Sequence, residues 1–250
     1  MPTAKYLVIS PHLDDGVFAC GQLLAAHPGS TVLTVFAGVP ETADEAPEWD
    51  VRCGFDSAEA AMAARREEDR QALAQLGAKP LWLSFVDSQY GQPPEAGALR
   101  AALRAALDTL QPDGVLVPIG LFHSDHLLVH EAAVEVLREA GRGQCLAYED
   151  ALYRRKPGLL QARLAALAAQ GWCATPTFPA PLGPVADKQR AVEAYASQLR
   201  GFGPGGWSDV LEPERYWLLT LRPSAAREEQ TASAARAMET AHDTAALAER

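Results

Sequence analysis

KYLVISPHLDDGVFACGQLLAA, residues 5–26, is the stretch that decides the fold. Residues 5–10 form a compact apolar run with β-branched side chains, which predicts a strand that ends at Pro11. Residues 16–26 then place apolar side chains at helical spacing until a His-Pro-Gly turn ends the pattern. A buried strand followed by a polar turn and a helix is the repeating unit of α/β folds.

The same alternation continues along the chain. Further strands are predicted by short apolar runs at 31–36, 80–85, 114–118, 144–148 and 216–221. Helices are predicted from the Ser57 cap to Gly77, at 95–109 and at 126–140. Short buried strands separated by longer helices favour an α/β fold with a Rossmann-like, mostly parallel sheet and helices on both faces.

Two segments break this pattern. Residues 38–56 have no period and predict a long loop, and loops of that length are often functional. Residues 201–206, GFGPGG, predict a flexible turn. The chain has 250 residues, 48% of them hydrophobic, and this is enough for one large domain, which we expect at residues 1–222. Residues 223–250 are rich in Ala, Glu and Arg and predict an exposed helix or a partly disordered tail.

Charge and cysteine spacing narrow the class of protein. Lys+Arg 22 against Asp+Glu 32 gives a net charge of −10, which disfavours nucleic acid or an anionic membrane as a partner because like charges repel. The N-terminal apolar run is too short for a secretory signal or a membrane span. Four widely spaced cysteines without a CxxC pair are typical of reduced thiols. We therefore expect a cytoplasmic protein, and a homo-oligomer is compatible with this composition.

PHLDDG, residues 11–16, lies where the first predicted strand ends and the first helix begins. Polar groups at that end of a strand face the crevice in which open α/β sheets bind ligands. The adjacent carboxylates of Asp14 and Asp15 repel each other, and a divalent cation with His12 as a further ligand would relieve that repulsion. Capping of the helix by Asp14 or Asp15 explains the same residues equally well, so this motif alone leaves both interpretations open.

GLFHSDHLLVHEA, residues 120–132, follows the strand predicted at 114–118 and contains three of the six histidines in the chain. His123 and His126 are three positions apart and share a face if that turn is helical. Zinc hydrolases use three protein ligands and leave one position for water. His12, one carboxylate and one of these two histidines would meet that count.

The histidines of this second motif also fit another arrangement. His126 and His130 have the spacing of an HExxH zinc helix, but Leu127 stands where that motif has its glutamate. We therefore expect His130 to be an ordinary histidine on a helix face.

Together the two motifs resemble the signature of the LmbE-like, or PIG-L, family of metal-dependent N-deacetylases. That family has a Pro-His-Pro-Asp-Asp-Glu element after the first strand and a His-x-Asp-His element later in the chain. The chain matches the first from Pro11 to Asp15 and the second from His123 to His126. Leu13 replaces the second proline, and Gly16 replaces the glutamate, which removes a carboxylate from the surroundings of the site.

The resemblance implies a zinc ion, with Fe²⁺ or Co²⁺ as alternatives, and a water on its open position. Three ligands are implied: His12, Asp15 and His126. Asp14 is then implied as the general base, and His123, oriented by Asp125, as the electrophile or the acid for the leaving amine. The implied reaction removes an N-acetyl group from an amino-sugar (N-acetylglucosamine-type) conjugate by attack of the zinc-bound water.

Residues outside the two motifs are candidates for substrate contacts. Arg65 is one, although an exposed ion pair with Glu68 at i, i+3 explains it as well. Asp87 follows the strand predicted at 80–85 and is placed to contact a sugar hydroxyl. Four more polar or aromatic side chains follow a predicted strand or lie in neighbouring loops: Trp49, Tyr90, Glu149 and Asp150.

Other functions remain open at this point. A nucleotide-binding module without hydrolysis is disfavoured, because no GxGxxG follows the first strand and adjacent carboxylates would repel a pyrophosphate. A non-catalytic metal- or sugar-binding protein on the same fold is a second alternative. A deacylase of N-acetylated amino acids is a third.

Overall fold

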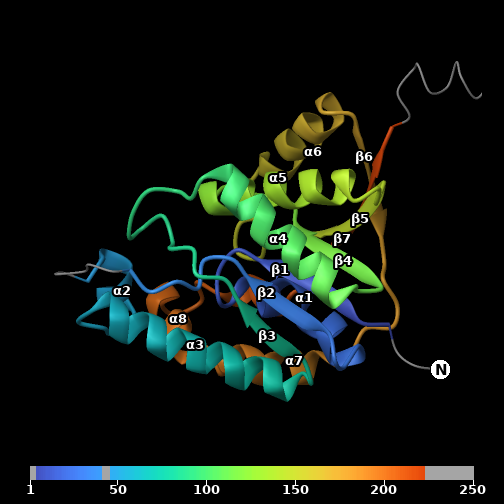
Figure 1. The fold of residues 1–250 in the computed structure, drawn as a ribbon. Helices are drawn as coiled ribbons and strands as arrows, with labels where there is room; N and C mark the ends of the chain where they lie inside the picture. The colour runs from blue at the N-terminus through green and yellow to red at the C-terminus, as the bar shows by residue number, and fades with distance from the viewer. Residues whose placement is uncertain (1–3, 41–45, 223–250) are drawn as a thin grey trace, which may run out of the picture.

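A computed structural model of the chain describes residues 4–40 and 46–222, and within them a central sheet carries helices on both faces (Figure 1). The strands are β1 Tyr6–Ser10, β2 Thr31–Thr34, β3 Lys79–Trp82, β4 Gly114–Pro118, β5 Gln144–Tyr148, β6 Trp172–Thr177 and β7 Tyr216–Leu221. Their order in the sheet is β3-β2-β1-β4-β5-β7-β6. Strands β1 to β5 pair in parallel, and β7 runs antiparallel to both β5 and β6. The predicted mostly parallel α/β sheet is thereby confirmed.

The helices form two layers. They are α1 Asp15–Ala26, α2 Glu48–Arg52, α3 Ala58–Gln75, α4 Ala96–Leu110, α5 Ser124–Glu139, α6 Leu159–Ala169, α7 Val185–Glu193 and α8 Ala196–Phe202, with a 3₁₀ turn, η1, at Ser208–Leu211. Helices α4, α5 and α6 cover one face of the sheet, and α1, α3 and α7 cover the other (Figure 1). Among the described residues, none of the helices is both long and apolar enough to cross a lipid bilayer.

Each face of the sheet has its own hydrophobic core, because successive side chains of a strand point to opposite faces. In β1, Leu7 and Ile9 pack against α4 and α5, whereas Val8 packs against α1 and α3. All three side chains are buried. A shift of one residue in the pairing of β1 would exchange these faces, so burial on both sides fixes the register and with it the position of the turn that follows.

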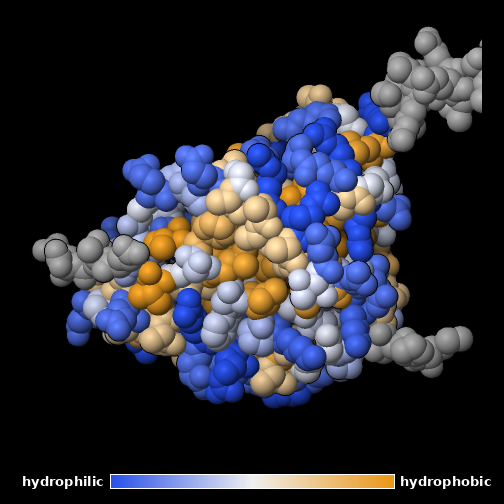
Figure 2. Space-filling view, in the orientation of Figure 1, coloured by the Kyte–Doolittle hydropathy of each residue, from blue (hydrophilic) through white to orange (hydrophobic). Residues whose placement is uncertain are grey.

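Both edge strands of the sheet contain a proline, Pro80 in β3 and Pro176 in β6. A proline has no amide hydrogen to offer to a further strand, and edges are a common place for it. Figure 2 shows hydrophilic side chains over α3 and a band of hydrophobic ones between α3 and α4, beside the edge strand β3.

Strand β6 was not among the predicted strands, because a proline and polar threonines hide its pattern.

Several predicted boundaries differ from the structure, and β2, for example, ends at Thr34 rather than at residue 36. The segment 38–56 is not entirely loop, since it contains α2. Strand β3 ends at Trp82 rather than at residue 85, and α5 begins at Ser124 rather than at residue 126. The turn at 201–206 begins later than predicted, because α8 continues to Phe202. The predicted tail, residues 223–250, lies outside the described residues.

The strand order creates a crevice between β1 and β4. The chain leaves β1 toward β2 on one side of the sheet and leaves β4 toward β5 on the other. Ligands of open α/β sheets bind where connections diverge in this way, at the carboxyl ends of the strands. The turn at residues 11–16 follows β1 and the turn at residues 119–123 follows β4, so both sequence motifs open onto the same crevice.

Candidate functional site

The turn after β1 is built so that its carboxylates do not cap the helix. The hydroxyl of Ser10 accepts a hydrogen bond from Gly16 N at 2.9 Å and donates one to His12 O at 2.6 Å. Asp14 occupies the N-cap position of α1, but its side chain makes no capping hydrogen bond. Asp15 Oδ2 accepts from the backbone amide of His12 at 2.9 Å. The helix-cap interpretation is therefore wrong for Asp14, whose carboxylate is left for another role.

His12, Asp15 and His126 bring three potential ligand atoms together. Asp15 Oδ2 lies 3.1 Å from His12 Nδ1 and 3.2 Å from His126 Nε2. All three atoms lie within 4.8 Å of one another. His126 Nε2 is buried and has no hydrogen-bond partner among the described residues. Two imidazoles and a carboxylate form a common donor set for zinc, so the residues present fit a divalent metal.

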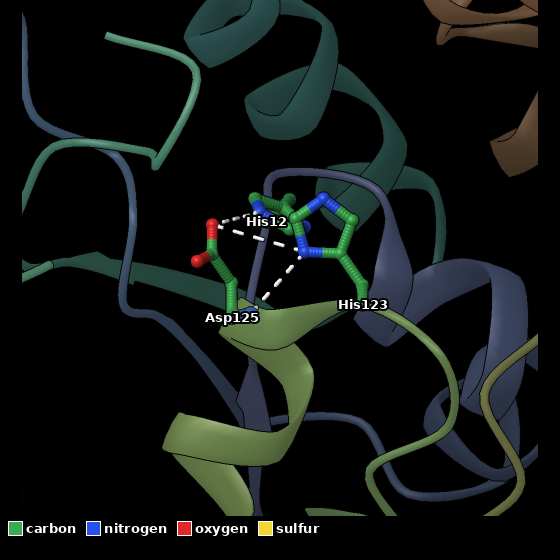
Figure 3. A group of neighbouring side chains, drawn as sticks. All are labelled: His12, His123 and Asp125. Carbon is green, nitrogen blue, oxygen red and sulfur yellow. Dashed lines mark hydrogen bonds and ion pairs between the residues drawn. The ribbon is translucent and has the colours of Figure 1, made fainter. Parts of the chain in front are cut away.

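His12 and His126 each have a further carboxylate beside the ring nitrogen that does not face Asp15. His126 Nδ1 lies 2.6 Å from Asp150 Oδ1, and His12 Nε2 lies 3.1 Å from Asp125 Oδ2. Histidines that bind metals usually donate their second nitrogen to such a partner, which fixes the tautomer and the orientation of the ring. Figure 3 shows the Asp125 carboxylate at the start of α5, beside both His12 and His123.

Asp150 also holds the turn that leads to the second motif. Its Oδ2 accepts hydrogen bonds from the backbone amides of Gly120 and Leu121, both at 2.9 Å. One buried carboxylate therefore fixes both the ring of His126 and the approach to His123. The prediction placed Asp150 at a strand end near the site, but it did not assign this role or the one of the Asp125 carboxylate.

His123 is the N-cap of α5, and its Nδ1 accepts from the backbone amide of Asp125 at 3.2 Å. The Asp125 carboxylate lies farther away, 3.9 Å from the same nitrogen. Asp125 thus orients His123 through its amide, while its carboxylate bonds to His12. Burial and the nearby charge of His12 lower the pKa of His123, which favours the neutral ring. Because Nδ1 is an acceptor, the proton of that neutral ring is on Nε2.

Two adjacent carboxylates give this site a strong negative charge. Burial, together with the charge of Asp15, raises the pKa of Asp14 to about 7. Burial acts in the same direction on Asp15, but His126 and His12 outweigh it and hold the pKa of Asp15 well below its usual range. A cation beside these residues would lower the electrostatic cost of ionising both. The negative charge of the site therefore favours a bound cation, as do the ligand atoms of His12, Asp15 and His126.

The crevice is a pocket of about 400 Å³. Its wall includes three carboxylates, those of Asp14, Asp15 and Asp87. It also includes His12, His123 and four aromatic side chains from distant parts of the chain: Phe36, Trp49, Tyr153 and Phe202. The sequence offered no signal for Tyr153 or Phe202, because they reach the pocket from the segment after β5 and from α8 without a motif of their own.

Arg65 lines the pocket, but its guanidinium is engaged. It donates to Asp50 Oδ1 at 2.5 Å and to the hydroxyl of Tyr90 at 3.0 Å. The alternative ion pair with Glu68 is wrong, because Glu68 instead accepts from the amide and hydroxyl of Ser197 at 2.8 and 2.7 Å. Arg65 therefore fastens α2, which carries Asp50, to α3.

The remaining candidates divide into two groups. Asp87 lines the pocket 3.7 Å from His12 Nε2, and Trp49 lines it on the side of α2 and α8. Tyr90 instead donates to Asp50 at 2.7 Å, and Glu149 accepts from the indole of Trp217 at 3.0 Å. The structure therefore brings Asp87 and Trp49 into the wall and leaves Tyr90 and Glu149 outside it.

His130 does not belong to either group of side chains that could hold a metal ion among the described residues. Its Nδ1 donates to Pro118 O at 2.7 Å, and burial lowers its pKa to about 3. The ring is fully buried on α5. It therefore connects the helix to the end of β4 as a neutral side chain, which agrees with the expectation that it is not a ligand.

Comparisons with known proteins identify a family and a curated relative that this chain resembles. The PIG-L family, described as GlcNAc-PI de-N-acetylase, matches residues 7–137. The 2′-N-acetylparomamine deacetylase of Streptomyces fradiae is 35% identical over 167 residues, which are 60% of this chain and 57% of that protein. The chain thus matches less than two thirds of the length of this curated relative.

Solved structures with a similar fold include several deacetylases. The zinc-inhibited form of teicoplanin deacetylase has a TM-score of 0.76 at 23% identity, over 88% of this chain and 100% of that one. The A40926 pseudoaglycone deacetylase has a TM-score of 0.65 at 25% identity, over 87% and 96%. The N,N′-diacetylchitobiose deacetylase of Pyrococcus horikoshii has a TM-score of 0.54 at 20% identity, over 88% and 84%.

Proposed function

The chain belongs to the PIG-L family, and on that premise we propose that it is a metal-dependent hydrolase that removes an N-acetyl group from an amino-sugar conjugate. One observation carries the proposal. His12, Asp15 and His126 converge on one point at the end of a pocket, and the side chains of Asp14 and His123 line the same pocket.

Zinc is the metal that we propose for His12, Asp15 and His126, and Fe²⁺ or Co²⁺ would accept the same donors. When bound, such a metal polarises the acetyl carbonyl and lowers the pKa of a water molecule to about 7. His126 Nε2, which is buried and makes no hydrogen bond among the described residues, and the carboxylates behind both imidazoles support this assignment.

Two side chains would assist the reaction, Asp14 by moving a proton and His123 by donating a hydrogen bond. Asp14 faces the pocket with no capping bond, and it takes the proton of the attacking water as the general base. His123, neutral with its proton on Nε2, donates a hydrogen bond to the carbonyl oxygen as negative charge develops there. Asp14 then passes the proton that it has taken to the leaving amine, which restores the carboxylate. In this scheme the bond that breaks is the amide C–N bond, and the products are acetate and the free amine.

The wall of the pocket supports a sugar as the substrate. Carboxylates such as Asp87 accept hydrogen bonds from hydroxyl groups, and the rings of Trp49, Phe202 and Tyr153 offer flat apolar faces. Relatives in the comparisons are named for N-acetylated sugar substrates, which also favours this class.

We expect the zinc-loaded protein to release acetate from a soluble N-acetylglucosaminyl conjugate. The assay compares a panel of such conjugates, with different aglycones, with a panel of N-acetylated amino acids, and it measures both acetate and free amine. Turnover confined to the amino acids would refute the sugar assignment and leave the amide chemistry standing. Binding of the sugars without any release of acetate would instead indicate a non-catalytic sugar-binding protein.

We also propose that the protein acts in the cytoplasm. All four cysteines are free thiols, three of them buried, and thiols persist in reducing compartments.

Removal of the Asp150 carboxylate should weaken metal binding. In Asp150→Asn, one oxygen is replaced by an amide nitrogen, so the side chain cannot accept from His126 Nδ1 and from both backbone amides at once. Loss of such a partner typically lowers metal affinity by about 10- to 100-fold. Competition with a chromophoric chelator measures the affinity directly.

Glu149→Gln is the matched control for that experiment. Glu149 precedes Asp150 in the chain, is equally buried, and bonds to Trp217 rather than to the metal cluster. It should retain the metal affinity of the unmodified protein. Equal affinities in Asp150→Asn and Glu149→Gln would show that Asp150 does not support the site.

A further inference from the structure

The backbone immediately before His123 is strained. The amide of His123 donates to Leu121 O at 2.7 Å, so Phe122 is the central residue of a three-residue γ-turn. Phe122 has a φ of 61°, which is the rare and strained form of this turn. A bulky side chain disfavours such a φ, and strain of this kind persists only where the surrounding structure imposes it.

Hydrogen bonds fix the chain on both sides of Phe122. Before it, the buried carboxylate of Asp150 accepts from two successive backbone amides, both at 2.9 Å. After it, the amide of Asp125 donates to the ring of His123 at 3.2 Å. Because the segments on either side are held, the strain falls on Phe122 itself.

The side chain of Phe122 is 63% exposed, yet its ring has two partners. It packs against the ring of Tyr153, with the centroids 5.4 Å apart and 33° between the planes. Lys156 Nζ lies 3.4 Å from the centroid of the Phe122 ring. Both contacts are attractive. Tyr153 lines the pocket, whereas Phe122 is not among the described residues that line it.

Tyr153 is itself held firmly in place. The buried carboxylate of Asp209 accepts from Leu152 N at 2.8 Å and from Arg154 Nε at 3.0 Å, so one carboxylate binds the residues on both sides of Tyr153. The Tyr153 ring also meets the ring of His126 edge to face, with the centroids 5.3 Å apart. A side chain that packs on Tyr153 is therefore fixed relative to the pocket.

We infer that Phe122 is a positioning residue for His123. The packing of its ring on Tyr153 holds the strained turn, and the turn directs the imidazole of His123 into the pocket. The inference rests on the proposed role of His123 as a hydrogen-bond donor, and it adds a residue outside the pocket wall to that function. If residue 122 relaxed to a negative φ, the chain would change direction, and His123 Nδ1 would lose its alignment with the Asp125 amide.

Three variants separate the effect of the ring from that of the backbone. Phe122→Tyr keeps the ring, Phe122→Ala removes it but keeps a Cβ, and Phe122→Gly removes both. Because a Cβ opposes a positive φ, we expect Phe122→Gly to unfold at a higher temperature than Phe122→Ala. At an exposed position with a negative φ the order is the reverse. Thermal unfolding of the zinc-loaded proteins measures this order.

The rate of acetate release from methyl N-acetylglucosaminide tests the effect on the reaction. Phe122→Ala should lower kcat by about 10-fold with unchanged metal content, because misplacement of a catalytic group slows the reaction. KM should change by less than about 2-fold, since the lost interaction belongs to the transition state. Phe122→Tyr should restore kcat. Phe178→Ala, at another exposed phenylalanine on the loop after β6, is the control and should keep both constants.

A second measurement does not require turnover. Long-range ¹H–¹⁵N NMR spectra of the zinc-loaded protein distinguish the two neutral tautomers of His123, whose signals are identified by their loss in His123→Asn. The unmodified protein should show the form with the proton on Nε2, because Nδ1 accepts from the Asp125 amide. Phe122→Ala should show a mixture of both tautomers, and Phe122→Tyr should keep the single form.

The outcomes separate the two proposals. An unchanged kcat and a single tautomer in Phe122→Ala would refute the positioning role and leave deacetylation standing. A higher KM with an unchanged kcat would also refute it, because the ring would then contact the substrate. Unfolding of Phe122→Gly below Phe122→Ala would remove the strain on which the inference depends. If none of the proteins releases acetate, the proposed activity on this sugar fails, and the spectra of His123 still decide the positioning role.

Discussion

Asp14→Asn is expected to keep its metal and to lose about 10²-fold or more in kcat, as is typical when a general base is removed. The asparagine preserves the shape of the side chain and can hold a water molecule, but it cannot take a proton. Helix α1 should be unaffected, because the Asp14 side chain makes no capping hydrogen bond. Rates of acetate release, together with metal analysis of the same preparation, measure the two properties separately.

Asp69→Asn is the control for loss of a buried carboxylate. Asp69 lies on α3 and accepts hydrogen bonds from Trp82 and Tyr195, both at 2.8 Å. Burial raises its pKa to about 7, so its protonated form, which asparagine resembles, is already well populated near neutral pH. This variant should keep both metal and rate. A rate within a few-fold of the unmodified protein for Asp14→Asn would mean that another group removes the proton.

His12→Ala and Asp15→Ala are each expected to lose nearly all of the bound metal and, with it, all measurable turnover. Each substitution removes one of three protein ligands and leaves two, whereas catalytic zinc sites typically use three. The unmodified protein, purified without chelators, should contain about one zinc, iron or cobalt ion per chain. Elemental analysis of the three proteins side by side measures the difference.

His130→Gln serves as the control for the loss of a histidine. The glutamine amide can replace the hydrogen bond to Pro118 O, although the exchange of a buried ring should lower the thermal stability. Metal content should remain near that of the unmodified protein. Near-stoichiometric metal in His12→Ala or Asp15→Ala would overturn the assignment of the ligands.

The mostly parallel sheet could be predicted from the sequence, apart from β6, because its other strands are short apolar runs. The resemblance of two short motifs to the family signature implied the proposed ligands, which stay a prediction. Apolar runs identify β1 and β4, and a polar motif follows each of them. Parallel strands that are neighbours in the sheet bring those motifs together at one edge, as β1 and β4 do. Each motif can therefore be recognised in the sequence alone, without knowledge of the contacts that bring the two motifs together.

The partners of the ligands could not be predicted in the same way. Asp150 reaches His126 because β5 pairs with β4, and no spacing within the chain encodes that neighbour. Arg65 was expected to contact substrate, and that expectation stays a prediction. Its contacts, to Asp50 and Tyr90, connect segments that are distant in sequence and have no periodic pattern.

Close packing explains why residue 16 is glycine, where the family motif has glutamate. A Cβ at this position would lie 2.8 Å from Val32 Cγ1 and 3.3 Å from Ser10 Oγ. The close approach of α1 to β2 therefore leaves no room for a larger residue unless Val32 moves. The packing beneath the site therefore explains this difference from the family motif, and the proposed ligands are not affected by it.

The helix α2, which shapes the pocket wall, and the residues proposed to carry out the reaction belong to different parts of the chain. Trp49 reaches the pocket on a five-residue helix that is held by side-chain contacts to α3 and α8, through Arg65 to Asp50 and through Gln198 to Trp49. The proposed metal ligands, together with Asp14 and His123, come instead from the segments that follow β1 and β4. Residues 46–55 can therefore diverge in evolution, or be grafted from a relative in the laboratory, to alter which molecule is recognised while the machinery that cleaves it is inherited intact.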